Sequence, residues 1–195
     1  MNTTTVSHRA LQVTLACTYN WAKTAIVSLM TDTILIVHDI RSAHNVGSIL
    51  RSAACFGIAH VYLGGYTPYP LAVNDERLPH IANKVHKTIV KTSLGAELTQ
   101  AWSHYTDISQ LLTDLRERGF RIAALELTEG AVPIDQAQLD TPTALLVGRE
   151  VEGISTELLN QCDIIYKICQ TTAKESLNVS VATAIACYQL SLGKL

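Results

Sequence analysis

Blocks of apolar and polar positions alternate along the chain and predict strands and helices in turn. The run TILIVH at Thr33 to His38 is rich in β-branched residues and predicts a buried strand. After a polar loop, Asn45 to Phe56 predicts a helix that its first residue caps and Gly57 ends. His60 to Leu63 predicts a second short strand, which two glycines stop.

The middle of the chain is less regular. Tyr66 to Pro79 contains three prolines and predicts a loop long enough to be functional. In the following stretch we expect a short strand near Thr88 to Val90, then a turn and a helical segment around Ala96. Asp107 to Arg118 predicts an amphipathic helix, because its isoleucine and leucines keep a spacing of three and four residues and Asp107 can cap it.

The second half continues the alternation of strands and helices. We expect strands at Arg121 to Leu127, Thr143 to Val147 and Ile164 to Ile168, and a short helix at Thr156 to Gln161. Strands that alternate with helices indicate an α/β fold with a mostly parallel sheet, covered by helices on both faces.

In such sheets, ligands bind outside the carboxyl ends of the strands. The loops expected at that edge are polar and follow three different strands. They are Asp39 to Asn45, Gly148 to Gly153 and Cys169 to Asn178. We therefore expect these loops to converge on one site.

The last helix, Glu175 to Leu190, is apolar on almost every face. One stripe holds five of its residues, and three small or branched residues fill much of the other side: Leu177, Val181, Ala184, Ile185 and Tyr188, then Val179, Ala182 and Ala186. A helix of this kind is buried all round. We expect the sheet to cover one side and a second copy of the chain to cover the other, with Ala182 and Ala186 on the partner-facing side.

Length and composition predict one compact domain. The chain has 195 residues, of which 48% are hydrophobic, and no linker or repeat divides it. Residues 1–29 fit the pattern poorly, so we expect an N-terminal extension there and the domain at 30–195. The extension lacks the uninterrupted apolar run of a membrane span, and a signal peptide is disfavoured because Gln12 and Thr14 break its apolar core.

Charge and cysteine content limit the partners. A net charge of -2 excludes a general polycation, so an RNA partner must be held by a local patch or by a groove between subunits. The five cysteines are odd in number and form no Cys-x-x-Cys pair, which predicts reduced thiols, a cytoplasmic protein and no metal site.

Three short motifs lie in the converging loops: Asn45-x-Gly47-x-x-x-Arg51, Gly148-x-Glu150-x-x-Gly153 and Ser176-Leu177-Asn178-x-Ser180. Neither Gly-x-Gly-x-x-Gly nor a P-loop is present, which argues against a dehydrogenase or a kinase. The absent side chain at Gly47 lets a ligand backbone approach the guanidinium of Arg51. Taken singly, the motifs have a structural reading as a helix cap, a solvated arginine and an ordinary turn.

Taken together, the segments HNVGSILRSA, LLVGREVEGIS and SLNVSVATAI resemble the motifs of the SpoU (TrmH-like) group of the SPOUT RNA methyltransferases. The resemblance runs from about Ile34 to Leu190. It implies an α/β fold with a deep C-terminal trefoil knot, a homodimer with composite active sites, and S-adenosylmethionine as cofactor. General rules of chain topology would argue against a knot, so the knot is expected from the resemblance alone.

The resemblance also implies roles for individual residues. The catalytic residues would be Arg51, Asn45, Glu150 and Asn178. The cofactor would be bound by Val147, Gly148, Gly153, Ile168, Ser176, Leu177 and Asn178. The chain departs from the family at Cys169, where a proline is usual, and this leaves the shape of the adenine loop open.

The expected reaction is methyl transfer from S-adenosylmethionine to a ribose 2'-hydroxyl of RNA, with tRNA preferred over rRNA because no extra RNA-binding domain is visible. Arginine is a poor base since its pKa lies above about 12. We therefore expect Arg51 to act as a cation that lowers the hydroxyl pKa while water or phosphate accepts the proton. The alternatives are a non-catalytic dimeric RNA-binding protein with the same fold, and an enzyme that methylates a base or a protein.

Overall fold

The structure is a computed structural model, and it describes residues 33–138, 141–171 and 176–192. All of these residues belong to one compact unit, Thr31–Leu195. The expected extension at residues 1–29 lies outside the described residues.

The described chain forms one sheet of seven parallel strands in the order β3-β2-β1-β6-β4-β7-β5. The strands are β1 (Thr33–His38), β2 (His60–Gly64), β3 (Trp102–Tyr105), β4 (Arg121–Leu125), β5 (Val132–Pro133), β6 (Thr143–Val147) and β7 (Ile164–Lys167). β1 is central, and its Val37 pairs with Leu63 on one side and with Val147 on the other. The predicted parallel sheet is therefore confirmed.

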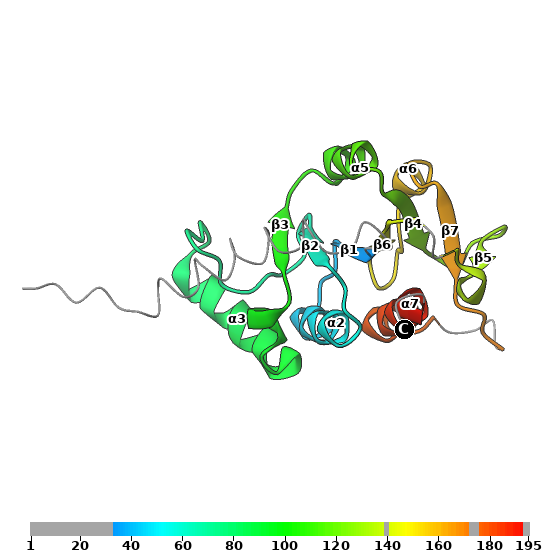
Figure 1. Ribbon diagram of the computed structural model, residues 1–195. Helices are drawn as coiled ribbons and strands as arrows, with labels where there is room; N and C mark the ends of the chain where they lie inside the picture. The colour runs from blue at the N-terminus through cyan, green and yellow to red at the C-terminus, as the bar shows by residue number, and fades with distance from the viewer. Residues whose placement is uncertain (1–32, 139–140, 172–175, 193–195) are drawn as a thin grey trace, which may run out of the picture. The chain divides into compact units, whose positions relative to one another are not determined.

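Helices cover both faces of the sheet (Figure 1). On one face lie α2 (Ala43–Cys55), α3 (Pro79–Ser93) and α7 (Val179–Ser191), and the short α4 (Ala96–Thr99) contacts α2 and α3. On the other face lie α5 (Ile108–Glu117) and α6 (Thr156–Leu159). A single 3-10 turn, η1 (Ile134–Gln136), follows β5.

Each face of the sheet has its own core because side chains alternate along a strand. Leu35 and Val37 of β1 pack with α2 and α7, whereas Ile34 and Ile36 pack with α5 and α6. β1 and β6 are buried on both sides, which explains why their sequences are continuous apolar runs.

Local hydrogen bonds confirm the predicted start of one helix and show that Asn45, the predicted cap of another, is not its cap. Asp107 caps α5, and its Oδ1 accepts a hydrogen bond from the backbone N–H of Gln110 at 3.0 Å. α2 begins at Ala43, two residues earlier than predicted, because Ser42 is the cap. The hydroxyl of Ser42 accepts from the backbone N–H of Asn45 at 3.3 Å.

The predicted strand at Thr88 to Val90 is wrong. These residues lie in α3, a helix of 15 residues that starts at Pro79. Their β-branched side chains favour strands, but the buried positions Ala82, Ile89 and Ser93 recur at a helical period, and tertiary packing on α2 decides the outcome. The strand of this region is β3, which the sequence reading missed.

The terminal helix is shorter than predicted and is not buried all round within one chain. α7 starts after its cap Asn178, and residues 172–175 lie outside the described residues. Val181 is 48% exposed and Tyr188 50%, whereas Ala186 and Cys187 are fully buried. The prediction that Ala186 faces a partner is therefore wrong, because it packs on the sheet side. Among the described residues, no helix is long and apolar enough to cross a membrane.

Candidate active site

Side chains from three of the predicted loops meet at the carboxyl edge of the sheet. The side-chain amide of Asn45 donates to Oε1 of Glu150 at 3.1 Å. The side-chain amide of Asn178 donates to Oδ1 of Asn45 at 3.3 Å. The three residues follow β1, β6 and β7 respectively, so the predicted convergence of these loops is confirmed.

Glu150 is held by the start of α2. Its carboxylate accepts hydrogen bonds from the backbone N–H groups of Arg41 and Ser42, each at 3.3 Å, in addition to the one from Asn45. Burial acts to raise the pKa of this carboxyl, but hydrogen bonds from its own backbone N–H and from these three donors outweigh burial, so the pKa of Glu150 is lowered. The carboxylate is therefore anionic at neutral pH, and it bridges the loops after β1 and β6.

Asn178 has a second task at the start of α7. Its Oδ1 accepts hydrogen bonds from the backbone N–H of Ser180 at 2.8 Å and from the hydroxyl of Ser180 at 2.7 Å. The residue caps α7 with its oxygen and contacts Asn45 with its nitrogen. The structural reading of the third motif expected the helix cap at Ser176, but the cap is Asn178. The catalytic role of Asn178 stays a prediction.

A pocket opens next to this hydrogen-bonded group. Of the residues expected to bind the cofactor, six line it: Val147, Gly148, Gly153, Ile168, Ser176 and Leu177. Asn178 does not line the pocket and lies at its edge, between Val179, which does, and Asn45. Glu150 also lines the pocket, so the carboxylate group and the pocket form one site.

The sequence reading missed the contribution of β4. Leu125, Glu126 and Leu127 line the pocket, as do Lys167 at the end of β7 and Gln170 after it. Oε2 of Glu126 accepts from the backbone N–H of Ile154 at 2.9 Å, and Oε1 accepts from that of Leu127 at 3.0 Å. An acidic residue at the carboxyl end of a predicted strand was a signal for this position, since β4 ends at the same edge.

The two glycines of the second motif are required by close backbone approach. Gly153 has φ +68°, and a Cβ there would overlap the carboxylate of Glu126. A Cβ on Gly148 would lie 2.9 Å from the backbone of both Gly153 and Ile154. The positive φ at Gly153 and the close backbone approach at Gly148 therefore favour glycine at both positions of this loop.

Gly47 has a different role from the predicted one. It is buried, and a Cβ there would overlap the hydroxyl of Thr92 and the carbonyl oxygen of Ile89, both on α3. The glycine permits α2 and α3 to pack closely and gives no ligand access to Arg51. The prediction of ligand approach at Gly47 is therefore wrong.

Arg51 stands apart from the hydrogen-bonded group. It lies on α2, its side chain is exposed, and it does not line the pocket. Among the described residues, none forms a hydrogen bond or ion pair with its guanidinium. Within one chain, the structure thus brings together Asn45, Glu150 and Asn178 but not Arg51.

The outer side of α7 carries an apolar stripe next to Arg51's helix. The stripe consists of Leu177, Val181, Ile185, Tyr188 and Leu192, which are between 38% and 50% exposed. The ring of Tyr188 meets that of Phe56, at the end of α2, edge-on with centroids 5.8 Å apart. Over the described ranges, no cluster of His, Cys, Asp or Glu could hold a metal ion.

Comparison with known proteins finds relatives that are named as RNA methyltransferases. Residues 32–188 match the model of the SpoU rRNA methylase family. The chain is 31% identical over 159 residues to an uncharacterized tRNA/rRNA methyltransferase of Mycoplasma pneumoniae, covering 81% of this chain and 60% of that protein. It is 27% identical to a TrmH family tRNA/rRNA methyltransferase of Staphylococcus haemolyticus, covering 81% of this chain and 57% of that one. The chain thus spans less than two thirds of these relatives.

Solved structures show the same fold. An rRNA methyltransferase of Sinorhizobium meliloti with bound AdoMet superimposes with a TM-score of 0.71 at 22% identity, covering 88% of this chain and 60% of that one. A TrmH/SpoU tRNA modifying enzyme of A. aeolicus superimposes with a TM-score of 0.68 at 22% identity, covering 91% of this chain and 83% of that one.

Proposed function

We propose, on the premise that this chain belongs to the SpoU rRNA methylase family, that it transfers a methyl group from S-adenosylmethionine to a ribose 2'-hydroxyl of RNA. The observation that carries the proposal is the pocket at the carboxyl edge of the sheet with the Asn45–Glu150–Asn178 group at its side. We place tRNA ahead of rRNA as substrate. The solved tRNA modifying enzyme of A. aeolicus supports this order, because this chain covers 83% of its length.

The pocket fits S-adenosylmethionine by its chemistry. Leu125, Val147, Ile168 and Leu177 supply apolar walls for an adenine ring, and Gly148 also lines the pocket. The carboxylates of Glu126 and Glu152 line the same pocket and can accept hydrogen bonds from ribose hydroxyls or an amino group. When bound, this cofactor supplies an activated methyl group on a sulfonium, so no covalent enzyme intermediate is needed.

The residues of the chain then have the task of positioning the attacking oxygen and managing its proton. The Asn45–Glu150–Asn178 group fixes the start of α2 and of α7 at the pocket, which keeps the geometry needed for in-line attack. Arg51 contributes a positive charge that lowers the pKa of the 2'-hydroxyl, and water or an RNA phosphate accepts the proton. This role needs no unusual ionisation of the guanidinium.

We further propose that the active site is shared between two subunits of a homodimer. Arg51 is exposed and does not line the pocket of its own chain, and the apolar stripe of α7 beside it is uncovered. Full burial of a large apolar side chain stabilises by about 1.5 to 3 kcal/mol, and these side chains are 38% to 50% exposed, so covering each would contribute roughly half of that or less. A two-fold contact through this stripe would cover it on both chains and bring Arg51 of each toward the pocket of the other.

Two other expectations remain proposals. The trefoil knot is supported by the strand order, because the late strands β6 and β7 insert between β1 and β4 and between β4 and β5. The assignment of residues 30–195 as the methyltransferase domain is supported by the family match over 32–188. Removing residues 1–29 should leave cofactor binding and methyl transfer unchanged, and loss of either would assign the extension to the working domain.

Calorimetry of S-adenosylmethionine binding tests the proposed function, with Arg51→Ala as the diagnostic variant. The wild type should bind the cofactor and methylate RNA, and Arg51→Ala should bind with the same affinity but transfer no methyl group. Loss of cofactor binding by a folded Arg51→Ala variant would show that Arg51 helps to bind the cofactor and that its assignment to the RNA substrate is wrong. A wild type that binds RNA but no cofactor would favour the alternative, a non-catalytic dimeric RNA-binding protein.

A further inference from the structure

Charge is distributed unequally over the two faces of the sheet. The helices α2, α3 and α7 contain no Asp or Glu, yet they carry Arg51, Lys84, Lys87 and Lys91. The helices of the other face, α5 and α6, carry Asp114, Glu117 and Glu157 besides Arg116. The chain has a net charge of -2, so a helix layer without carboxylates is a local basic surface on an acidic protein.

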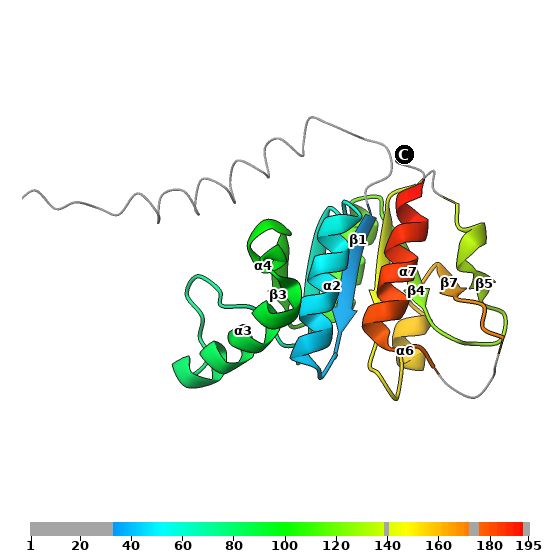
Figure 2. The ribbon, with the colours of Figure 1, turned by 90° about the horizontal axis from the view of Figure 1, so that it is seen from below.

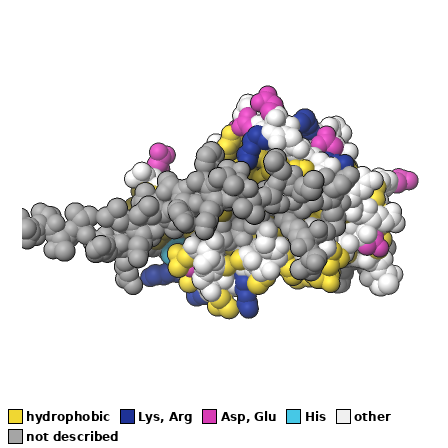
Figure 3. Space-filling view, in the orientation of Figure 1, with side chains coloured by type: hydrophobic (Ala, Val, Ile, Leu, Met, Phe, Trp, Pro, Cys, Tyr) yellow, Lys and Arg dark blue, Asp and Glu magenta, His cyan; other side chains and the backbone are white. Residues whose placement is uncertain are grey.

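The only carboxylate of the small helix beside this layer is withdrawn from solvent. Glu97 of α4 is 7% exposed, and its Oε2 accepts hydrogen bonds from the hydroxyl of Ser93 and from the backbone N–H of Gly95. In the space-filling view, Lys and Arg side chains lie along the edge over α3, whereas over α5 Asp and Glu are interspersed with Lys and Arg (Figure 3). The basic character of α3 is therefore not neutralised by its neighbour.

The three lysines of α3 form one row on its solvent side. Lys84, Lys87 and Lys91 are spaced by three and four residues, opposite the buried positions Ala82 and Ile89. At about 1.5 Å of rise per residue, the row is about 10 Å long. All three side chains are exposed, and within the described ranges none of their ammonium groups forms a hydrogen bond or an ion pair. Among the residues that the structure describes, the three ammonium groups have no partner, so the row can bind an anionic partner.

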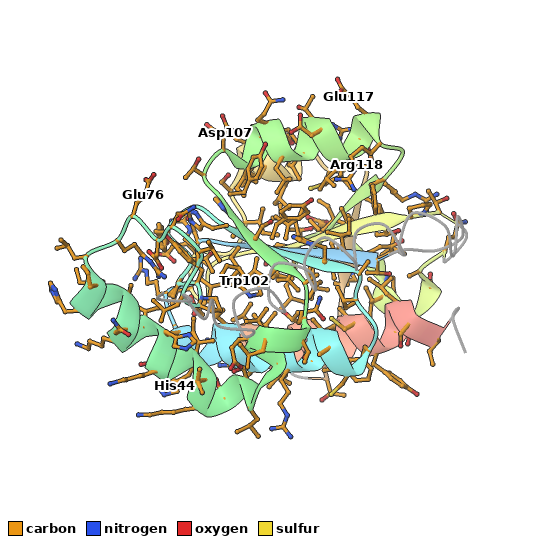
Figure 4. The ribbon with its side chains drawn as sticks, turned by 60° about the vertical axis from the view of Figure 1, so that its left-hand side comes forward. His44, Glu76, Trp102, Asp107, Glu117 and Arg118 are labelled. Carbon is orange, nitrogen blue, oxygen red and sulfur yellow. The ribbon has the colours of Figure 1, made fainter. Side chains whose placement is uncertain are left out.

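The row leads to the candidate active site. α3 reaches outward beyond β3 at its first turn and approaches α2 at its last (Figures 1 and 2). There the hydroxyl of Thr92 donates to the carbonyl oxygen of His44 at 2.9 Å, next to Lys91. His44 lies beside the last turns of α3 (Figure 4) and directly precedes Asn45 of the hydrogen-bonded group. An RNA backbone whose phosphates contact the lysine row would therefore extend to the start of α2.

We propose that the lysine row of α3 is the docking surface for the phosphate backbone of the RNA substrate. This proposal rests on the proposed function and adds where the substrate is held. Lysines contribute to RNA affinity through phosphate charge and not through base edges, so the row provides affinity and direction toward the site but no sequence choice. It also resolves how an acidic protein holds RNA, since the positive charge is concentrated on one helix.

The experiment compares two pairs of substitutions in the full chain, binding a fluorescein-labelled, unmodified tRNA transcript at several KCl concentrations. Lys87→Gln/Lys91→Gln should weaken binding about tenfold and lower the salt slope by about one to two, as expected for two lost phosphate contacts. Arg116→Gln/Arg118→Gln is the matched control. It removes the same charge from the opposite face, where Figure 4 labels Arg118, and should leave the affinity within about twofold.

Three further measurements test whether the loss of RNA binding is due to the lost charge, whether the cofactor pocket is intact, and whether the partner is RNA. Lys87→Arg/Lys91→Arg should restore binding, because the charges are retained. S-adenosylmethionine affinity should be equal in both pairs, which checks that the pocket is intact. Poly-L-glutamate should compete less well than unlabelled tRNA at matched charge, and equal or better competition would reassign the row to an acidic protein partner.

The outcomes for the docking surface and for the proposed function are separable. Equal losses of RNA affinity in both pairs, or a wild type that binds cofactor but no RNA, would overturn the docking surface. If the lysine substitutions weaken RNA binding but the wild type binds no cofactor, the proposed function is overturned and the docking surface stands.

Discussion

The side chains of Asn45 and Asn178, which are 133 residues apart in the chain, are joined by a hydrogen bond of 3.3 Å. The bond connects the start of α2 with the start of α7, and Glu150 extends the connection to the loop after β6. The three motifs of the sequence are thereby parts of one hydrogen-bonded group.

The first prediction separates the two tasks of Asn178. Asn178→Asp keeps an oxygen that accepts from Ser180 but cannot donate to Asn45, so the cap remains and the link between the helices is lost. We expect its unfolding free energy to stay near that of the wild type and its methyl transfer to fall at least tenfold. Asn178→Ala should lose activity and also about 0.5 to 2 kcal/mol of stability. Urea unfolding and single-turnover transfer measure the two effects, and equal activity of Asn178→Asp and wild type would refute the link.

The second prediction concerns the packing of α2 on α3. Gly47→Ala places a methyl group where the Thr92 hydroxyl and the Ile89 carbonyl lie, so one helix must shift. We expect a loss of about 1 to 3 kcal/mol in the free energy of unfolding. Ser48→Ala, one position along the same helix and half-buried, should change it by less than about 0.5 kcal/mol. Similar unfolding curves for the two variants would mean that Gly47 has another function.

The third prediction is a pH dependence from Glu150. Its pKa in the folded protein lies below the ordinary glutamate value of 4.5, so the folded state favours the anion and Glu150 stabilises the fold above that pH. The contribution should disappear as the pH falls through the lowered pKa, because the protonated carboxyl accepts hydrogen bonds less well. The unfolding free energy of the wild type should exceed that of Glu150→Gln at pH 7, and the difference should shrink below pH 4.5. A difference that is constant from pH 7 to pH 3 would contradict the assignment.

The fourth prediction tests the homodimer at the apolar stripe of α7. Ile185 is 38% exposed in one chain, so Ile185→Glu is tolerated by the fold but places two like charges in a two-fold contact. Sedimentation should show a dimer for the wild type and a monomer with little activity for Ile185→Glu. Thr113→Glu, on the exposed side of α5, is the control and should remain dimeric. A stable and fully active wild-type monomer would rule out the shared site.

The same contact predicts complementation between inactive chains. Arg51→Ala and Asn178→Ala should each be inactive, but a mixed dimer restores one site that has both residues intact if they act across the interface. On a two-fold symmetric contact, one of the two sites of each mixed dimer is intact. We therefore expect a mixed dimer to recover up to about half of the activity of the wild-type dimer. No recovery in a dimer shown to be mixed would mean that Arg51 and Asn178 act within one chain.

The sequence predicted the sheet and the meeting of its loops because both depend on local patterns. β1 and β6 are runs of apolar residues that only a strand buried on both faces explains, and Asp107 marks the start of α5 by its chemistry. The positions of Asn45, Glu150 and Asn178 followed from one rule, that parallel strands end at a common edge. The hydrogen bonds between their side chains show that the three loops meet at that edge.

The predictions that were wrong or incomplete concern which neighbouring residues a side chain contacts in the folded protein. From the sequence alone, the absent side chain at Gly47 could make room for a ligand or for another helix. In the structure, α3 occupies that space. Ala186 and Ile185 are equally apolar in sequence, and only packing decides that Ala186 is buried and Ile185 exposed. Glu126 was missed because its partner, the backbone of Ile154, lies on another strand's loop. Strand propensity at Ile89 was overridden by packing on α2.

The position of the transferred methyl group tests the central claim most directly. Purified protein is incubated with methyl-labelled S-adenosylmethionine and unmodified tRNA or rRNA, and the RNA is digested to nucleosides and analysed by mass spectrometry. The account predicts label in a 2'-O-methylated nucleoside, more from tRNA than from rRNA, and none with Arg51→Ala. Label on a base, on protein, or in an equal amount with Arg51→Ala would contradict it.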